Sequence, residues 1–107
     1  MADYIVVLST VSSLSEAGWI GEELINRKLA ACVSVVPGVT SYYRWGGTAQ
    51  TGKELLLVIK TRQDKYDEVA KAIKEHHSYE VPEIIALPIA AGDEQYLKWI
   101  DESCCDS

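Results

Sequence analysis

The order of apolar runs along the chain is the feature that most restricts how it can fold. Two segments, at 14–28 and 63–77, repeat apolar residues every three or four positions, as amphipathic helices do. Runs rich in β-branched and aromatic residues are typical of strands. Four such runs lie around the helical segments, at 4–8, 31–45, 53–61 and 84–89. The order strand, helix, strand, strand, helix, strand predicts a ferredoxin-like α+β domain, with an antiparallel sheet and the helices on one of its faces.

Capping residues mark where the helices begin. Ser13 and Glu16 have the spacing of a capping box, so the first helix is expected to start after Ser13. Asp93 can cap a short helix near the end of the chain. Residues 1–107 are expected to form a single domain, with about 102–107 as a flexible tail.

Polar residues, glycine and proline mark where the strands end or bend. Ser9 and Thr10 are expected to end the first strand, and Pro37 is expected to kink the second. The glycine-rich segment 46–52 has the composition of a hairpin turn between the second and third strands.

Composition and charge exclude several classes of function. The chain is 48% hydrophobic, enough for its own core, and no apolar run reaches the roughly 20 residues that a membrane span requires. A formal net charge of −6 repels nucleic acid and anionic lipid. The three cysteines suggest no disulfide framework, and the start of the chain lacks the basic flank of a secretory signal. We therefore expect a cytoplasmic protein without nucleic-acid or membrane partners.

The second strand is too long to stay within the body of a small domain. At about 3.3 Å per residue, the segment 31–45 would reach roughly 50 Å, against a radius of gyration of roughly 13 Å for a domain of this length. Its hairpin should project and expose Tyr42, Tyr43 and Trp45, which is rare on a monomer. The apolar last strand, with Pro88, suits a sheet edge. We therefore expect another copy of the chain to cover both the projecting hairpin and the edge formed by the last strand.

Two adjacent histidines, His76 and His77, are the first candidates for metal ligands. Imidazole binds transition metals, but neighbouring side chains on a helix point about 100° apart and rarely share one ion. His77 follows the apolar stripe of its helix and is the better candidate for a packed or capping residue. His76 is the better candidate for a surface ligand, with Glu80 or Glu83 as the carboxylate that joins it.

Cysteines and basic residues give weaker indications of a site. Cys32 suits a small residue of a buried strand. Cys104 and Cys105 could bind a soft cation, although exposed tail residues without a role are the simpler expectation. Lys60 and Arg62 could form an anion site or an ordinary surface pair.

Five blocks, in order, resemble the CutA family of divalent-cation tolerance proteins. They are KLAACV at 28–33, PGVTSYYRW at 37–45, LVIKT at 57–61, HHSYEVPEIIALP at 76–88 and YLKWI at 96–100. The resemblance implies a ferredoxin-like protomer in a tight homotrimer, similar in architecture to the PII signal-transduction proteins and cytoplasmic in bacteria. It also implies a role in tolerance to copper and other divalent cations.

The resemblance further implies a copper site. Copper ligation in the family is ascribed to the two adjacent histidines, here His76 and His77, and to a cysteine after the first strand, here Ser9. Without that thiol, the remaining nitrogen and oxygen donors suit Cu²⁺ better than Cu⁺. No metal is expected to be required for folding.

Two functions other than copper tolerance are considered. The PII-like architecture implies one of them, and the other is catalysis. The alternative is a signalling or scaffold trimer that binds a small molecule in clefts between subunits. The residues expected to line such a cleft are Tyr43, Trp45, Glu54, Lys60, Tyr79 and Glu83. Acylphosphatases share the topology, but the arginine of their phosphate loop has no counterpart in residues 9–15. We therefore expect no enzymatic activity.

Overall fold

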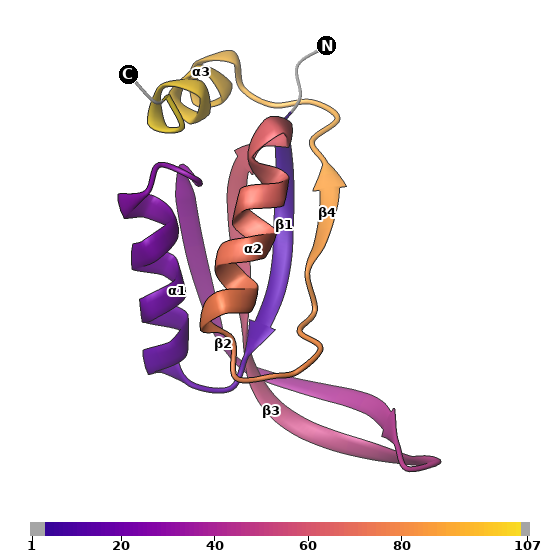
Figure 1. Cartoon of the computed structure of the whole chain (residues 1–107). Helices are drawn as coiled ribbons and strands as arrows, with labels where there is room; N and C mark the ends of the chain where they lie inside the picture. The colour runs from indigo at the N-terminus through magenta and orange to yellow at the C-terminus, as the bar shows by residue number, and fades with distance from the viewer. Residues whose placement is uncertain (1–3, 106–107) are drawn as a thin grey trace.

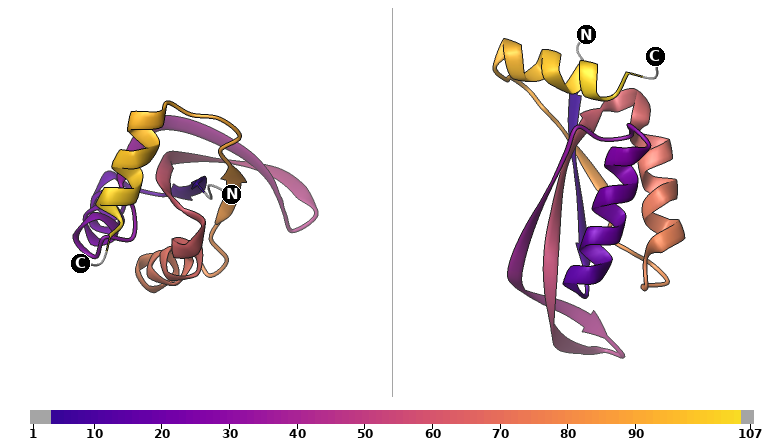
Figure 2. Two further views of the ribbon diagram at one scale, coloured as in Figure 1. Left: turned by 90° about the horizontal axis from the view of Figure 1, so that it is seen from above. Right: turned by 90° about the vertical axis from the view of Figure 1, so that its left-hand side faces the viewer.

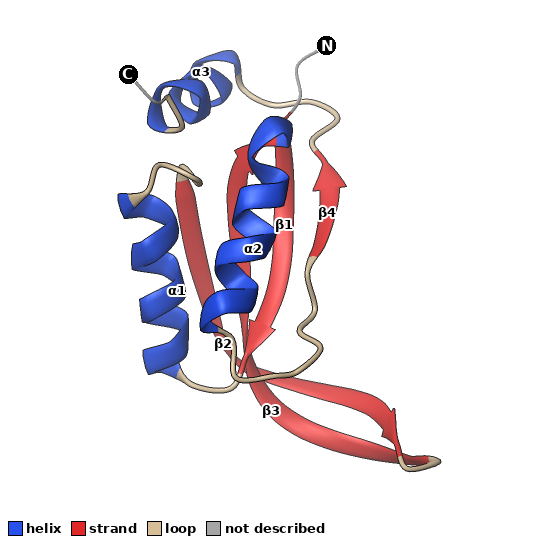
Figure 3. Ribbon diagram, viewed as in Figure 1, coloured by secondary structure: helices blue, strands red, loops and turns tan. Residues whose placement is uncertain are grey.

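The sheet and its two covering helices follow the expected ferredoxin-like arrangement. The computed structural model describes residues 4–105. One antiparallel sheet has the order β2-β3-β1-β4, and α1 and α2 lie on one of its faces (Figures 1 and 3). The elements are β1 (Tyr4–Val11), α1 (Leu14–Asn26), β2 (Cys32–Trp45), β3 (Thr48–Arg62), η1 (Gln63–Lys65), α2 (Tyr66–His76), β4 (Ile85–Pro88) and α3 (Glu94–Ser103). The predicted α+β fold is therefore confirmed.

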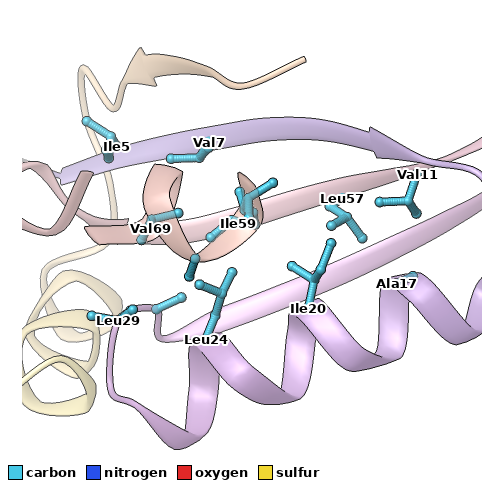
Figure 4. Close-up of a cluster of buried hydrophobic side chains, with 13 residues drawn as sticks. Ile5, Val7, Val11, Ala17, Ile20, Leu24, Leu29, Leu57, Ile59 and Val69 are labelled. Carbon is cyan, nitrogen blue, oxygen red and sulfur yellow. The ribbon is translucent and has the colours of Figure 1, made fainter. Parts of the chain in front are cut away.

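The core lies between the sheet and the helices and follows the apolar periods of the sequence. Alternate strand residues point toward the helices, and every third or fourth residue of α1 and α2 points back. Each core residue named here is at most 2% exposed. They are Ile5, Val7, Val11, Ala17, Ile20, Leu24, Leu57, Ile59, Val69 and Ile73, most of them shown in Figure 4. This cluster holds both helices on the sheet.

The first strand is longer than the sequence predicted. Ser9 and Thr10 do not end it, because their backbones pair with Leu57 and Leu56 of β3 and the strand continues to Val11. The expected end at Ser9 and Thr10 is therefore wrong. Pairing across the sheet outweighs the weak local preference of these two residues.

The hairpin turn is shorter than the glycine-rich segment suggested. Only Gly46 and Gly47 form it, with φ values of 61° and 83°, as a tight type I′ turn requires. β3 therefore begins at Thr48 rather than at residue 53. Gly52 lies within the strand, where a ring carbon of Tyr43 is 3.5 Å from the position a Cβ would take.

Capping fixes the ends of α1. The Ser13 hydroxyl accepts a hydrogen bond from the Glu16 N–H at 3.2 Å, as expected. The Glu16 carboxylate accepts from the N–H of Ser12 at 3.0 Å instead of closing back on Ser13, so only half of the capping box forms. α1 ends at Asn26 because Lys28 has a left-handed φ of 58°.

In the described part of the chain, no helix has the length and apolar character to cross a membrane.

The end of the chain is packed as far as the structure describes it. α3 contains the first two residues of the segment 102–107, and Cys104 behind them is 1% exposed. Its Sγ lies 3.6 Å from the Thr61 hydroxyl oxygen. The expectation of a tail with an exposed Cys104 is therefore wrong, because this side chain packs beside β3, while Cys105 is exposed. Residues 106–107 lie outside the described residues.

Polar contacts hold α3 against the end of the sheet. Asp93 caps this helix as expected, accepting a hydrogen bond from the N–H three residues on at 3.0 Å. The Tyr4 hydroxyl donates to Asp101 at 2.5 Å, and Arg62 Nε lies 3.8 Å from the same carboxylate. β1, β3 and α3 are thereby tied together.

The hairpin formed by β2 and β3 projects beyond the helices, as Figure 2 shows. It gives the molecule extents of 46 × 26 × 22 Å. The register of β2 slips between Val36 and Val39, which confirms the kink expected at Pro37. Tyr42 and Trp45 on the hairpin are 78% and 74% exposed. The projection predicted from strand length is therefore confirmed.

The face of the sheet turned away from α1 and α2 is apolar, and we call it the open sheet face. Its side chains alternate with core residues along β1 and β3 and continue across β4. They are Val6, Leu8, Leu56, Val58, Ile85 and Leu87. Ile85 and Leu87 are 49% and 50% exposed. Their strand, β4, is a sheet edge, as its proline predicted.

Candidate functional site

The two histidines end α2 but meet different neighbours. The His76 ring packs against Trp19 of α1, with ring centroids 4.7 Å apart. Its Nε2 lies 4.0 Å from Oε2 of Glu23, and its side chain is 19% exposed. His76 is therefore an imidazole beside a carboxylate, held at the surface between two helices.

The side chain of His77 is buried and is hydrogen-bonded at both ring nitrogens. Its Nε2–H donates to the Thr10 carbonyl at 2.7 Å, and its Nδ1 accepts from the Tyr79 N–H at 3.0 Å. These two bonds require the neutral tautomer protonated at Nε2. The side chain is 0% exposed, so a metal at His77 would have to break one of them. The sequence expectation of a packed or capping histidine matches this geometry.

Ser9 occupies the position at which the family resemblance implies a cysteine in related proteins. Its hydroxyl is 0% exposed and has no hydrogen-bond partner. It lies on β1 between Val7 and Val11 in alternation, so it faces the helices. A cation could not reach this side chain without opening the core.

The unpartnered hydroxyl of Ser9 leads to a stability prediction. Ser9→Ala is expected to raise the free energy of unfolding by about 1 kcal/mol, because it removes a buried polar group that makes no hydrogen bond. Thr61→Val is the matched control, since the Thr61 hydroxyl donates to the Leu29 carbonyl at 2.6 Å. The control should lower stability by about 1–2 kcal/mol. Urea unfolding measures both, and equal destabilisation by the two variants would contradict the prediction.

A cluster of polar side chains lies where the hairpin leaves the body of the protein. We call Thr10, Ser41, Glu54, His77 and Tyr79 the hairpin-base cluster. Glu54 accepts hydrogen bonds from the Tyr79 hydroxyl at 2.8 Å and from the Ser41 hydroxyl at 2.5 Å. His77 joins it through Thr10 and Tyr79. The cluster therefore ties the loop after α2 to both strands of the hairpin and to β1.

Hydrogen bonding sets the protonation of the cluster. Burial alone would raise the pKa of Glu54, but hydrogen bonds from Ser41, Tyr79 and Thr10 outweigh it and lower that pKa below its ordinary value. Burial, followed by the hydrogen bond to Glu54, raises the pKa of Tyr79 to about 12. At neutral pH the pair is a carboxylate that accepts from a neutral phenol.

Glu16 is a second carboxylate with a lowered pKa. Burial would raise its pKa, but hydrogen bonds from Ser12 and Ser78 outweigh that effect. The Ser78 N–H donates to it at 2.6 Å, so Glu16 joins the start of α1 to the loop after α2. It also lies 3.9 Å from Nδ1 of His77.

These two carboxylates predict how stability depends on pH. Because each folded-state pKa lies below 4.5, the unfolded chain binds more protons than the folded one in acid. Their contribution is fully present above pH 4.5 and is lost as the pH falls through the folded-state values. The free energy of unfolding of Glu54→Gln should therefore fall less between pH 5 and 3 than that of the unsubstituted protein. Urea unfolding at several pH values measures this, and parallel curves would contradict it.

The other residues expected to line a cleft lie far apart within a single chain. Lys60 donates to the Ser34 hydroxyl at 2.9 Å on the open sheet face. It is six residues from Glu54 along β3, or roughly 20 Å. Trp45 lies at the hairpin tip, and Glu83 is exposed in the loop before β4. Of the six residues, only Glu54 and Tyr79 are joined by a hydrogen bond, so a cleft that uses all of them needs neighbouring subunits.

Glu80 and Glu83 do not meet the histidines in the described part of the chain. No hydrogen bond or ion pair joins either carboxylate to His76 or His77, and Glu80 instead lines an open groove beside α2. Among the described residues, no three His, Cys, Asp or Glu side chains converge as a metal site. The carboxylate beside His76 is that of Glu23 on α1.

Comparison with known proteins identifies the family. The family description "CutA1 divalent ion tolerance protein" matches residues 5–103. The chain belongs to this family. The CutA protein of Thermus thermophilus is 47% identical over 92% of this chain and 95% of its own length. The crystal structure of CutA1 from Oryza sativa matches with a TM-score of 0.95 and 43% identity, covering 99% of this chain and 97% of that one.

Relatives in the CutA family differ in length. The Oryza sativa protein named CutA 1, chloroplastic, is 45% identical over 96% of this chain, which spans 58% of that relative. The resemblance inferred from five sequence blocks is thus confirmed, and the chain is a CutA-family divalent-cation tolerance protein.

Proposed function

We propose that this protein supports tolerance to divalent cations as a cytoplasmic homotrimer that binds copper or a similar cation and catalyses no reaction. The observation that carries the proposal is the family match over residues 5–103, from the first strand to the last helix. The family's name describes cation tolerance and no reaction. No disulfide joins the cysteines of the described residues, which is consistent with a reducing compartment.

Exposed apolar surface supports the trimer. Ile85 and Leu87 on the open sheet face are half exposed, and Trp45 on the hairpin is 74% exposed. Both edges of the sheet, β2 and β4, also offer backbone groups for pairing with another chain. Contiguous apolar area of this kind typically marks an interface. Trp45→Asp combined with Tyr43→Asp should weaken an assembly that uses the hairpin.

The surroundings of His76 support cation binding there. Within residues 4–105 its Nε2 makes no hydrogen bond and lies 4.0 Å from Glu23, whereas both ring nitrogens of His77 are hydrogen-bonded. Nitrogen and carboxylate oxygen donors suit Cu²⁺. His76 is therefore the ligand of the proposal, and His77 supports the helix end from which it projects.

A copper titration tests the proposed cation site. Cys105→Ser provides the background, because Cys105 is the exposed thiol. His76→Ala in that background should weaken Cu²⁺ binding at least about tenfold, as expected when one ligand is lost. His77→Ala should instead lower the free energy of unfolding, because it removes two buried hydrogen bonds. Calorimetric titration and urea unfolding separate the two effects, and unchanged copper affinity in His76→Ala would reject the site.

The hairpin-base cluster favours one alternative, a PII-like signalling or scaffold trimer that binds a small molecule between subunits. Glu54 and Tyr79 were both expected in such a cleft, and they form a hydrogen bond at 2.8 Å. Equilibrium dialysis against divalent cations and cytosolic metabolites distinguishes the functions. Retention of a metabolite, lost in Glu54→Gln, would favour signalling, while selective retention of metal would favour tolerance by binding.

A further inference from the structure

We propose that the hydrogen bond between Tyr79 and Glu54 fixes the direction in which the β2–β3 hairpin leaves the body of the protein, and so presents Tyr43 and Trp45 for assembly. The inference rests on the proposed function, in which another copy of the chain contacts the hairpin. It gives Glu54 and Tyr79 a positioning role within a single chain, one that requires neither a metal nor a small molecule.

The hairpin leaves the sheet at a hinge. β1 pairs with β3 only as far as Leu55, so the β3 residues before Leu55 pair with β2 alone. On the opposite strand the register slips between Val36 and Val39, where Gly38 has a φ of 77°. A ribbon of two strands twists strongly and is only marginally stable by itself. The backbone therefore leaves the hairpin able to change its direction at this point.

Glu54 is the first β3 residue beyond the pairing with β1, and its side chain reaches back to the body of the protein. Its Oε2 accepts from the Tyr79 hydroxyl at 2.8 Å, and its Oε1 accepts from the Ser41 hydroxyl across the hairpin at 2.5 Å. The Thr10 hydroxyl of β1 also donates to this carboxylate. In residues 4–105, the side-chain hydrogen bonds between the hairpin (39–54) and the rest of the chain meet at Glu54.

The Tyr79–Glu54 bond is anchored at both ends. Glu54 is a carboxylate at neutral pH, and hydrogen bonds to an ionised acceptor are roughly twice as strong as those between neutral groups. Tyr79 is held by its own N–H, which donates to Nδ1 of His77 at 3.0 Å. Figure 1 shows the loop after α2, to which Tyr79 belongs, passing the base of the hairpin. The bond therefore ties the hairpin to the end of α2.

The direction of the hairpin determines where its aromatic residues lie. Tyr43 and Trp45 share one side of the ribbon with Ser41, because alternate residues of a strand point the same way. Trp45 is six residues beyond Val39, or roughly 20 Å along the strand, so a small rotation at the hinge moves it far. A hairpin that must be ordered during assembly weakens the assembly. Loss of the bond should therefore weaken the trimer although Tyr43 and Trp45 are unchanged.

Fluorescence anisotropy decay of Trp45 measures the motion of the hairpin. Trp19→Phe and Trp99→Phe leave Trp45 as the only tryptophan of the chain. Leu8→Asp in the same protein places a carboxylate on the open sheet face and disfavours assembly through that face. Segmental motion of a loosened hairpin takes place in nanoseconds to microseconds, and its nanosecond part lowers the residual anisotropy.

Loss of the Tyr79–Glu54 bond should release the hairpin. Tyr79→Phe and Glu54→Ala are each expected to lower the residual anisotropy of Trp45, and Glu54→Gln, which keeps one acceptor oxygen, should lie between them and the parent. Tyr4→Phe is the matched control, because the Tyr4 hydroxyl also donates to a carboxylate, that of Asp101, at the end of the sheet away from the hairpin. The control should leave the anisotropy unchanged. Equal values for Tyr79→Phe and Tyr4→Phe would reject the inference.

Sedimentation of the same variants without Leu8→Asp separates this inference from the proposed function. Tyr79→Phe should raise the concentration at which half of the trimer dissociates at least about fivefold, while Tyr4→Phe should not change it. A looser hairpin with an unchanged trimer would reject the role in assembly. If the unsubstituted protein is a single chain, the proposed trimer fails, and the role in assembly fails with it. If it is a trimer but Tyr79→Phe leaves the anisotropy of Trp45 unchanged, the positioning role alone is rejected.

Discussion

Leu8→Asp is expected to turn the proposed trimer into a monomer at micromolar concentration. Leu8 lies at the centre of the open sheet face, paired with Val58 of β3 and Ile85 of β4. In an assembly that covers this face, the new carboxylate would lose its water without gaining a partner, which costs several kcal/mol. In a monomer the carboxylate stays hydrated, so the fold itself should survive.

Trp19→Asp is the matched control for this change. Trp19 is a large exposed side chain on α1, on the opposite side of the sheet, and is 59% exposed. Sedimentation should show three chains for the control and one chain for Leu8→Asp, with the circular dichroism of both close to that of the unsubstituted protein. A Leu8→Asp protein that remains a trimer would show that the open sheet face is not the interface.

Ile59→Ala is expected to lower the free energy of unfolding by about 3 kcal/mol, and by as much as 5 kcal/mol if the cavity does not collapse. Ile59 is 0% exposed and lies on the central strand β3, between Val7 of β1 and Val33 of β2. Its side chain belongs to the core cluster that holds α1 and α2 on the sheet. Removing it therefore loosens the sheet and the helical layer together.

Ile25→Ala is the control for the core substitution. Ile25 belongs to α1 but is 42% exposed, so its truncation should cost well under 1 kcal/mol. Urea unfolding at one protein concentration compares the two variants, because assembly makes stability depend on concentration. Similar losses for Ile25→Ala and Ile59→Ala would contradict the assignment of the core.

Regular periodicity made the fold predictable from sequence, while contacts between distant segments decided the details. The run of β-branched residues in β1 and the helical repeats of α1 and α2 depend only on near neighbours, so their type was predicted correctly. The end of β1 was not, because Ser9 and Thr10 are held by pairing with β3. Cys104 was placed in a tail because nothing in the local sequence reveals its contact with Thr61.

The candidate site shows the same limit. The apolar stripe of the second helix correctly indicated a packed His77, yet its acceptor is the backbone of Thr10, which no sequence pattern can identify. The carboxylate expected beside His76 was sought nearby in sequence, at Glu80 or Glu83. Glu23 lies there instead because α1 packs against α2, which only the folded structure brings together.

Native mass spectrometry of the Cys105→Ser protein, with and without Cu²⁺, tests the proposed trimeric cation-binding protein most directly. It reads the number of chains and the number of bound ions in the same particle. The expected result is three chains that hold one copper ion per chain, with the copper lost in His76→Ala while the trimer persists. A single chain, or a copper count that His76→Ala leaves unchanged, would contradict the account.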